Sequence, residues 1–312
     1  MLVLGLDIGT QSAKALLLDA NGAVRGTAAV DYPIDTPHPG WAEQAPETWW
    51  AAACEAIRQV IGQAPEPVAT VALSGQMHGV ALLSARGEPV RPAILWTDAR
   101  AGIEAKELRE TVPQLVEIAG NPIMASFSAP KLVWLARHEA AVLKRARWFL
   151  LPKDYVRLRL TGEVATDPSD ASGTLLFDLC RRQWASDVIG RIGLDPAWFP
   201  PVVASGAVAG YITHEAAEQT GLKQGIPVLA GGADMAMGAV GAGLIEPDVA
   251  GVLLSTAGQV LLTVERIAPE ALGRVYYFAH AIPDRYFAMG ALLSAGLSLR
   301  WLRDVLRGVS FA

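Results

Sequence analysis

The chain has 312 residues, more than one ordinary hydrophobic core requires, so about two domains are expected. Hydrophobic residues make up 52% of it, which indicates a packed globular protein, and a formal net charge of −5 with scattered Lys and Arg predicts no nucleic-acid partner. The two cysteines, Cys54 and Cys180, lie far apart without CxxC spacing, which argues against a thiolate metal site and favours a reducing compartment.

The first segment, residues 2–32, is predicted to form three short strands. Its opening letters MLVLGLD lack a basic region and reach an acid at Asp7, so they indicate a strand rather than a secretion signal. Asn21-Gly22 predicts a hairpin turn, because both residues tolerate positive φ between apolar runs. No apolar run reaches the roughly 18–20 residues that span a bilayer, so a cytoplasmic protein with no membrane partner is expected.

Helices and buried strands are predicted to alternate over the next part of the chain. Pro46 opens a stretch with apolar residues at helical spacing, and this helix is expected to run to residue 62. A further helix is expected from residue 97, with Thr97 or Asp98 as its cap. The other predicted elements are strands over 68–75 and 91–96, helices over 129–146 and 152–162, a strand and glycine turn over 225–234, and a small-residue helix over 235–244.

A second set of strands is predicted to begin near residue 249. Strands are expected over 249–255, 260–264 and within 275–289, and a helix over 292–308. The letters LGLDIGTQSAKALLL and GVLLSTAGQVLLTV share one plan, which is an apolar strand, a Gly/Thr turn and a second apolar strand. The sequence therefore predicts α/β domains in which the second half opens as the first half does.

The letters GLDIGTQSAK place Asp7 at a strand end and Gly9-Thr10 in a tight turn. Backbone N–H groups and a hydroxyl in such a turn suit phosphate oxygens, and Asp7 could hold Mg²⁺ through water. An ordinary hairpin turn is the alternative, and Lys14 by itself is typical of a surface charge.

Two further strands are followed by polar side chains. Met77 and His78 follow the strand 68–75, and ligands of open α/β sheets bind at the carboxyl ends of strands. The letters LWTDAR end the strand 91–96 in the same manner and offer Trp96, Thr97, Asp98 and Arg100. His78 as a structural residue, and Asp98 as a helix cap paired with Arg100, stay open as alternatives.

Asp234 is the one charge in LAGGADMAMGAVGAG. An ionised carboxylate is costly to bury without a partner, and a helix N-cap or a solvated turn is the alternative to a functional role. Asp154 and Asp170 stand in no context that separates them from solvated acids. The five histidines show no metal-ligand spacing, and no GxSxG or Cys/His nucleophile pattern occurs.

Eight stretches, in order and at matching spacing, resemble the FGGY family of carbohydrate kinases, and most closely its xylulokinase branch. They are LGLDIGTQSAKALLLD, HPGWAEQAPETWW, ALSGQMHG, RPAILWTDAR, APKLVWLARHE, LLPKDYVRLRLTGE, TDPSDASGTLLFD and VLAGGADMAMGAVGAG. The resemblance implies an α/β, actin-like/ribonuclease H-like ATPase fold and an ATP-dependent ketose kinase, with D-xylulose as the favoured substrate.

The resemblance also implies a role for each candidate residue. Asp234 would be the catalytic base that accepts the proton of the sugar hydroxyl. The ketose would contact Met77 and His78, beside a wall formed by Trp96, Asp98 and Arg100. ATP and Mg²⁺ would be held at the phosphate turns by Asp7, Gly9, Thr10, Lys14, Thr256 and Gly258, with Asp7 binding the magnesium through water.

Three departures from the family pattern bear on these expectations. Met235 follows the predicted base where a polar residue is usual, so another pentulose or a polyol stays open as the substrate. Ser255-Thr256-Ala257 replaces the usual Gly-Thr-Ser of the second phosphate turn. Family members are also longer, so residues 1–245 are expected to form the sugar-binding and catalytic domain, and residues 246–312 the start of a truncated nucleotide-binding domain. A non-catalytic sugar-binding fragment, and a homodimer, stay open as alternatives.

Overall fold

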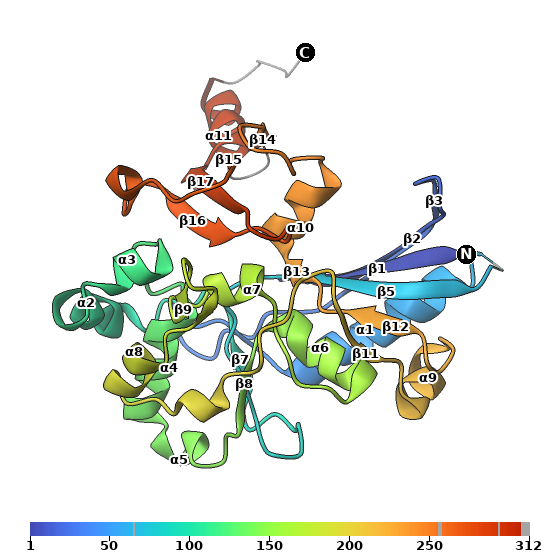
Figure 1. The fold of residues 1–312 in the computed structure, drawn as a ribbon, viewed down its shortest axis with the longest axis horizontal. Helices are drawn as coiled ribbons and strands as arrows, with labels where there is room; N and C mark the ends of the chain where they lie inside the picture. Colours follow the sequence, from blue (N-terminus) through green and yellow to red (C-terminus); the bar gives the residue numbers. More distant parts are fainter. Residues whose placement is uncertain (65, 255–257, 293, 307–312) are drawn as a thin grey trace.

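The computed structural model describes residues 1–64, 66–254, 258–292 and 294–306. It consists of a larger α/β part, built around one mixed sheet, and a smaller part with a second sheet (Figure 1). The second sheet and α11 (Gly296–Leu306) lie at the top of Figure 1, and α10 (Asp234–Gly241) leads from the main sheet toward them.

The main sheet has seven strands, in the order β11-β12-β5-β1-β2-β3, with β13 pairing against β5. The strands are β1 (Leu2–Ile8), β2 (Ser12–Leu18), β3 (Val24–Asp31), β5 (Val68–Gly75), β11 (Val208–Tyr211), β12 (Pro227–Leu229) and β13 (Gly232–Ala233). β1, β12 and β13 each run parallel to β5, whereas β1, β2 and β3 are antiparallel neighbours. The carboxyl ends of β1, β5 and β13 therefore meet at one edge of the sheet.

The hairpin between β2 and β3 follows from its turn residues. Gly22 has φ +79°, and the carboxylate of Asp19 accepts hydrogen bonds from the backbone N–H groups of Asn21 at 2.8 Å and Ala23 at 3.0 Å. A left-handed backbone is cheap for glycine, because it has no Cβ. The predicted Asn21-Gly22 turn is confirmed.

The helix α1 (Pro46–Ile61) covers one face of the main sheet. Pro46 stands in its first turn, where the missing N–H has no intrahelical partner to lose. Trp49, Ala53 and Ile57 recur every four residues and are fully buried, so one stripe of the helix packs on the sheet. In β1, every second residue is buried against the same core, which fixes the register of the strand.

The remaining elements surround this core. The helices are α2 (Gly102–Thr111), α3 (Leu115–Ala119), α4 (Ser128–His138), α5 (Ala140–Leu143), α6 (Pro152–Thr161), α7 (Pro168–Ser172), α8 (Ser186–Arg191) and α9 (His214–Thr220), with 3₁₀ turns at Pro196–Trp198 and Pro269–Ala271. Short strand pairs are formed by β4 (Glu43–Gln44) with β7 (Ala93–Ile94), β6 (Ala81–Leu83) with β8 (Trp148–Leu150), and β9 (Phe177–Asp178) with β10 (Gln183–Trp184).

The second sheet is antiparallel, in the order β14-β15-β17-β16. Its strands are β14 (Ala250–Leu254), β15 (Gly258–Val264), β16 (Tyr276–Ala279) and β17 (Tyr286–Leu292). The pair β14–β15 is an antiparallel hairpin like β1–β2, as the similar sequence plans predict. This sheet is not isolated, because Phe278 and Phe287 belong to the same apolar cluster as Met77 of the larger part.

Three local predictions were wrong, for reasons of tertiary context. The helix expected over 129–146 is two helices, since the backbone leaves helical geometry at Glu139. The strand expected over 91–96 is reduced to the two residues of β7. Neither Thr97 nor Asp98 caps α2, which begins at Gly102 without a side-chain cap. Asp98 instead accepts hydrogen bonds from Ala42 and Arg100.

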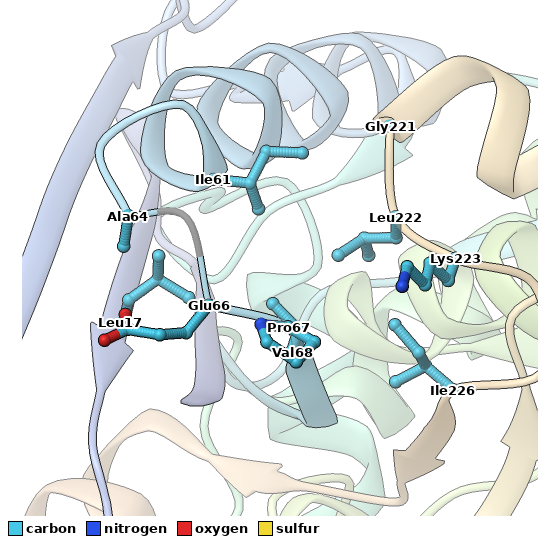
Figure 2. A pocket seen from close by; sticks show the side chains of 10 residues that line it. All are labelled: Leu17, Ile61, Ala64, Glu66, Pro67, Val68, Gly221, Leu222, Lys223 and Ile226. Atoms are coloured by element: carbon cyan, nitrogen blue, oxygen red, sulfur yellow. The ribbon is translucent and has the colours of Figure 1, made fainter. Parts of the chain in front are cut away.

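A pocket of about 300 Å³ lies at the amino-terminal end of β5, opposite the edge where β1, β5 and β13 end (Figure 2). Figure 2 shows its lining coming from β2, the end of α1, the connection from α1 to β5, the start of β5 and the segment after α9; the residues are Leu17, Ile61, Ala64, Glu66, Pro67, Val68, Gly221, Leu222, Lys223 and Ile226. None of the predicted site residues lines it. Within the described ranges, no helix is long and apolar enough to cross a membrane.

Candidate active site

The candidate site lies where β1, β5 and β13 end. Across these strands Asp7 pairs with Ser74, which in turn pairs with Gly232, so the three residues stand side by side. Neighbouring strands lie about 4.8 Å apart, which places the backbones of Asp7 and Gly232 about 10 Å from each other. Asp234 follows two residues later as the first residue of α10. The fold therefore brings the two predicted functional carboxylates to one edge, where open α/β sheets bind ligands.

The side chain of Asp234 is half-buried at the start of α10. Its Oδ1 accepts a hydrogen bond of 2.7 Å from the backbone N–H of Met235. Burial raises the pKa of Asp234 to about 7, the Met235 N–H opposes part of that rise, and the charge of Asp7 adds to it. At neutral pH a large fraction of Asp234 is ionised, and its pKa lies in the range that suits a general base.

The turn between β1 and β2 is held by several hydrogen bonds. The N–H of Gly9 donates to Ser12 O at 3.0 Å, and Gly9 O accepts from the Tyr32 hydroxyl at 2.6 Å and from Gln76 Nε2 at 3.1 Å. Gln44 Nε2 donates to Thr10 O at 2.8 Å. These contacts fix the backbone of the turn, and the predicted binding of phosphate oxygens there stays a prediction beside the alternative of an ordinary hairpin turn.

Asp7, Lys14 and Ser74 share one surface beside this turn. Lys14 stands directly opposite Asp7 on β2, and Asp7 Oδ1 accepts a hydrogen bond of 2.9 Å from the Ser74 hydroxyl. All three line a cleft of about 730 Å³ between the sheet and α10, which contributes Met237 and Val240. The cleft therefore presents one carboxylate and one ammonium group on an otherwise apolar lining.

This surface fits a magnesium ion that retains water ligands. Mg²⁺ prefers oxygen ligands and is usually held by one or two carboxylates together with substrate phosphates. Asp7 supplies such an oxygen ligand, whereas no cluster of three or more His, Cys, Asp or Glu residues that could cage a metal occurs in the described part of the chain.

Met77 and His78 lie in the loop that follows β5. His78 has a left-handed backbone with φ +65°, and its ring Nδ1 donates to Gly173 O at 2.5 Å. Burial lowers the pKa of His78 to about 4, so the ring is neutral at physiological pH. Because Nδ1 carries the proton that bonds to a carbonyl, Nε2 is an acceptor for a ligand hydroxyl.

Gly173 permits the close approach of this loop. A Cβ at position 173 would lie 2.9 Å from Met77 Cε and 3.0 Å from His78 Nδ1. Any side chain there would displace both of the residues predicted to contact the sugar. The glycine is therefore a steric requirement of the candidate site, which the local sequence pattern did not reveal.

Trp96 connects the predicted sugar wall with the predicted phosphate turn. Its indole Nε1 donates a hydrogen bond of 2.9 Å to the hydroxyl of Thr10, and its side chain remains 41% exposed. The ring thus presents a solvent-accessible surface next to the turn at Gly9-Thr10.

Asp98 and Arg100 lie behind this wall rather than on its surface. Asp98 accepts hydrogen bonds from Ala42 N at 2.6 Å and from Arg100 Nε at 2.9 Å and Nη2 at 2.7 Å. The Arg100 guanidinium also pairs with Glu43 at 2.7 Å and stacks on Trp41, 3.6 Å from the ring centroid. Both side chains are almost fully buried, so the geometry gives them a supporting place, and their direct contact with a sugar stays a prediction.

A buried ion cluster near Asp234 was missed from the sequence. Lys153, Asp154, Arg157, Asp167 and Asp170 all have fully buried side chains, so the interpretation of Asp154 and Asp170 as solvated acids was wrong. Lys153 Nζ lies 2.6 Å from Asp154, 3.0 Å from Asp167 and 3.4 Å from Asp170. Burial raises the pKa of Asp170 well above its usual range, and the charge of Asp234 contributes to the rise.

The segment from β14 to β15 is described only in part. Thr256 lies outside the described residues, and Gly258 opens β15, where it pairs with Leu254 on β14 and Leu292 on β17. Met235 lines a second hollow of about 430 Å³, which lies between α10 and β14 and also includes Asp234. The roles predicted for Thr256 and Gly258 toward phosphates stay predictions.

Comparison with known proteins shows the family to which the chain is similar. Residues 2–241 match the model of the FGGY family of carbohydrate kinases, N-terminal domain. The chain is 38% identical to the xylulose kinase of Escherichia coli (strain K12) over 299 residues, and 36% identical to that of Staphylococcus xylosus over 307 residues. These matches cover 96% and 97% of this chain, but 62% and 64% of the relatives.

Solved structures give the same result for the fold. The crystal structure of xylulose kinase from Rhodospirillum rubrum matches with a TM-score of 0.94 and 31% identity, over 98% of this chain and 64% of that chain. Plasmodium falciparum glycerol kinase with ADP matches with a TM-score of 0.89 at 18% identity, over 98% of this chain and 63% of that chain, which supports the fold alone. The expected actin-like, mixed α/β fold is confirmed.

Proposed function

Since the chain belongs to the FGGY family of carbohydrate kinases, we propose that it carries the sugar-binding and proton-accepting machinery of an ATP-dependent ketose kinase. The favoured reaction is conversion of D-xylulose to D-xylulose 5-phosphate, because relatives at 36% to 38% identity are xylulose kinases. The chain spans 62–64% of the length of these relatives, and we assign residues 1–245 to the sugar-binding domain and 246–312 to the nucleotide-binding one.

The observation that carries the proposal is the placement of Asp234. A carboxylate with a pKa of about 7 stands at the carboxyl edge of three parallel strands, at the same edge as Asp7 and the Met77–His78 loop. A sugar hydroxyl has a pKa far above 7, so it attacks phosphorus efficiently only when a base accepts its proton as the new bond forms. This position and pKa support a general-base role for Asp234.

The reaction requires one proton transfer and one phosphoryl transfer. The carboxylate of Asp234 accepts the proton of the terminal ketose hydroxyl while that oxygen bonds to the γ-phosphorus of ATP. The bond from the γ-phosphorus to the oxygen that bridges it to the β-phosphorus breaks, and ADP leaves with the electron pair. Phosphoryl transfer needs little covalent chemistry from the protein, so alignment and charge neutralisation account for most of the rate.

The turn between β1 and β2 would bind the phosphates of ATP. The Thr10 N–H and hydroxyl and the Lys14 ammonium would contact the phosphates, Gly9, whose N–H is paired with Ser12 O, would let them approach the backbone, and Asp7 would hold magnesium through water. Bound Mg²⁺ would supply neutralisation of the phosphate charge. The hydrogen bonds from Tyr32 and Gln76 to Gly9 O keep this turn in place.

The loop after β5 would bind the sugar. His78 Nε2 would accept a hydrogen bond from a ketose hydroxyl, and the apolar side chain of Met77 would pack against the carbon chain. Trp96 would cover the sugar from the side of the phosphate turn.

Calorimetry and a coupled assay test the two halves of the proposal separately. Calorimetry of the chain with D-xylulose, L-xylulose, D-ribulose and xylitol measures which compound binds, and we expect D-xylulose to bind most tightly. The coupled assay measures ADP release with Mg²⁺ and ATP, with and without D-xylulose. Sugar-dependent ADP release supports the kinase, sugar binding without ADP release supports only the sugar-binding role, and failure of every ketose to bind contradicts both.

A further inference from the structure

Lys131 is a fully buried lysine for which the proposed reaction has no use. It lies on the second turn of α4, and its side chain has no exposed surface. Its Nζ donates to His78 O at 3.1 Å and to Ser126 O at 2.6 Å. Among the ion pairs of the described residues none includes Lys131, so two backbone carbonyls are the groups that satisfy it.

Burying an amine in this way is costly. An ammonium group withdrawn from water without a carboxylate partner loses several kcal/mol of hydration. Burial accordingly lowers the pKa of Lys131 to about 7, while the charge of Asp98 works in the opposite direction. A long apolar side chain would fill the same space at no such cost, so the donors of Lys131 serve a purpose beyond packing.

The carbonyl that Lys131 binds belongs to a strained residue. A left-handed backbone is unfavourable in a residue other than glycine, and it persists only where the surroundings determine it. His78 has φ +65°. Its ring donates a hydrogen bond to Gly173 O, and the centroids of the His78 and Phe127 rings lie 4.4 Å apart. The backbone carbonyl of His78 is held by Lys131.

The helix that carries Lys131 is tied to the same surroundings. Ala129 N, in the first turn of α4, donates to Thr174 O at 3.0 Å, next to the residue whose carbonyl binds the His78 ring. Ser126 O, the second acceptor of Lys131, precedes Phe127, which packs on that ring. The amine of Lys131 therefore joins the His78 loop to the segment before α4, and the backbone of α4 joins both to the segment that holds the His78 ring.

We propose that Lys131 is a positioning residue of the sugar site, whose Nζ holds the His78 carbonyl and thereby fixes the left-handed backbone that directs the His78 ring. That His78 contacts a ketose rests on the proposed function, whereas the link from Lys131 to His78 does not. Without the amine, His78 is free to relax to negative φ, and its ring then leaves Gly173 O and no longer presents Nε2 to the ligand.

The variant Lys131→Met tests the link, because it keeps the length of the side chain and removes the donors. The first readout needs no ligand. With ¹³C-labelled histidine the chain gives five sets of histidine resonances, and His78→Gln assigns the set of His78. We expect Lys131→Met to shift or broaden the His78 Cα and ring resonances, and Leu132→Met, an equally buried change on the same helix, to leave them in place.

The second readout is the dissociation constant of D-xylulose measured by calorimetry. Loss of one buried hydrogen bond corresponds to an increase of about 10-fold to 100-fold in Lys131→Met. Lys131→Gln keeps a donor, and we expect an intermediate affinity. If wild-type protein does not bind D-xylulose, the proposed function is wrong, and the His78 resonances still decide the role of Lys131.

Three results overturn the inference. The first is a folded Lys131→Met protein with unchanged His78 resonances. The second is such a protein with wild-type affinity for D-xylulose, where the wild type binds it. The third is failure of both Lys131 variants to fold, which makes Lys131 a determinant of folding rather than of the sugar site.

Discussion

The hydroxyl of Ser169 accepts a hydrogen bond of 3.0 Å from the backbone N–H of Ala233, the residue before Asp234. Ser169 in turn donates to Asp167, which pairs with Lys153 in the buried ion cluster. The first turn of α10 is thus attached to a rigid network of charges rather than to solvent. This network helps to hold the candidate base in position, and the Asp234 carboxylate itself accepts a hydrogen bond from Met235 N.

Replacement of Ser169 tests this attachment. Ser169→Ala leaves Ala233 N without its partner and removes one of the three hydrogen bonds that Asp167 Oδ2 accepts, the other two coming from Ser169 N and the Ser205 hydroxyl. We therefore expect the free energy of unfolding to fall by about 1–3 kcal/mol. We also expect kcat to fall, because Asp234 is then less firmly positioned. Urea denaturation and steady-state kinetics measure the two effects.

The matched control for Ser169→Ala is Ser172→Ala. Ser172 is equally buried in α7, donates to Ser169 O and accepts a hydrogen bond from Ala279 N. Within the described residues, none of its side-chain hydrogen bonds reaches the segment before Asp234. We expect a similar loss of stability and little change in kcat. Equal effects of both changes on kcat would show that Ser169 acts on stability alone.

Asp234→Asn tests the role of Asp234 in catalysis. Asn keeps the shape of the side chain but cannot accept the hydroxyl proton, so kcat of an active kinase is expected to fall by about 10²-fold to 10⁴-fold. The dissociation constant of D-xylulose is expected to change little. A variant that keeps more than about a tenth of wild-type kcat contradicts the general-base assignment, since that loss is below the range for general-base catalysis.

The same substitution makes a prediction about stability and pH. The pKa of Asp234 is about 7 in the folded protein and 3.8 for an ordinary Asp, so between these values the folded state binds more protons than the unfolded state. The contribution of this group to stability is therefore complete below about pH 4 and is lost as pH rises through about 7.

Asp234→Asn removes that loss. At pH 8 the variant is expected to be more stable than the wild type by about 1–3 kcal/mol, and near pH 4 the two are expected to be equally stable. Denaturant titrations over this pH range measure the difference, with Asp31→Asn, a change at an exposed carboxylate, as the control. A difference that does not depend on pH would mean that burial leaves Asp234 ionised.

The roles of the His78 backbone and of the His78 ring can be tested separately. Asn tolerates a left-handed backbone better than Ala does, so His78→Asn can keep the backbone conformation with φ +65° while it removes the imidazole. If the ring binds the ketose, His78→Asn and His78→Ala are both expected to weaken D-xylulose binding by about 1–3 kcal/mol, and His78→Ala is expected to be the less stable protein. Calorimetry and thermal denaturation separate the two effects. Loss of stability with unchanged sugar affinity would identify His78 as a structural residue.

Local patterns were sufficient for much of the fold and for the position of the site. The Asn21-Gly22 turn, the helix that begins at Pro46 and the strand over 68–75 depend on neighbouring residues, and each was predicted close to its observed bounds. The candidate site could be located because glycine turns and polar residues follow strands whose carboxyl ends meet.

What could not be predicted depends on partners far away in the sequence. Asp154 and Asp170 are buried because Lys153 neutralises charge in a cluster that also contains Asp167, and no local pattern shows which charges meet. The left-handed backbone of His78 is likewise determined by contacts with Lys131 and Gly173. Periodicity describes which face of an element is apolar, but it does not identify the polar groups that satisfy one another across the fold.

The hydrogen bond from Trp96 Nε1 to the Thr10 hydroxyl makes a prediction about communication between the two sides of the site. It joins the residue predicted to cover the sugar to the turn predicted to bind phosphate. Trp96→Phe keeps an aromatic surface and removes the donor, and Thr10→Val keeps the shape of Thr10 and removes the acceptor. Each change alone is expected to raise the dissociation constant of D-xylulose by about 3-fold to 10-fold, because the aromatic ring loses its fixed orientation.

The double variant decides whether the bond itself is responsible. If Trp96 and Thr10 act through one hydrogen bond, its loss is complete in either single variant, so the combined change is expected to weaken sugar binding no further than the larger single change. Residues in contact commonly show such non-additivity, of about 0.5–3 kcal/mol, whereas independent sites add. Calorimetry with D-xylulose on the wild type, the two single variants and the double variant completes the cycle. Additive losses would mean that Trp96 and Thr10 influence the sugar independently, and that the sugar wall does not communicate with the phosphate turn through this bond.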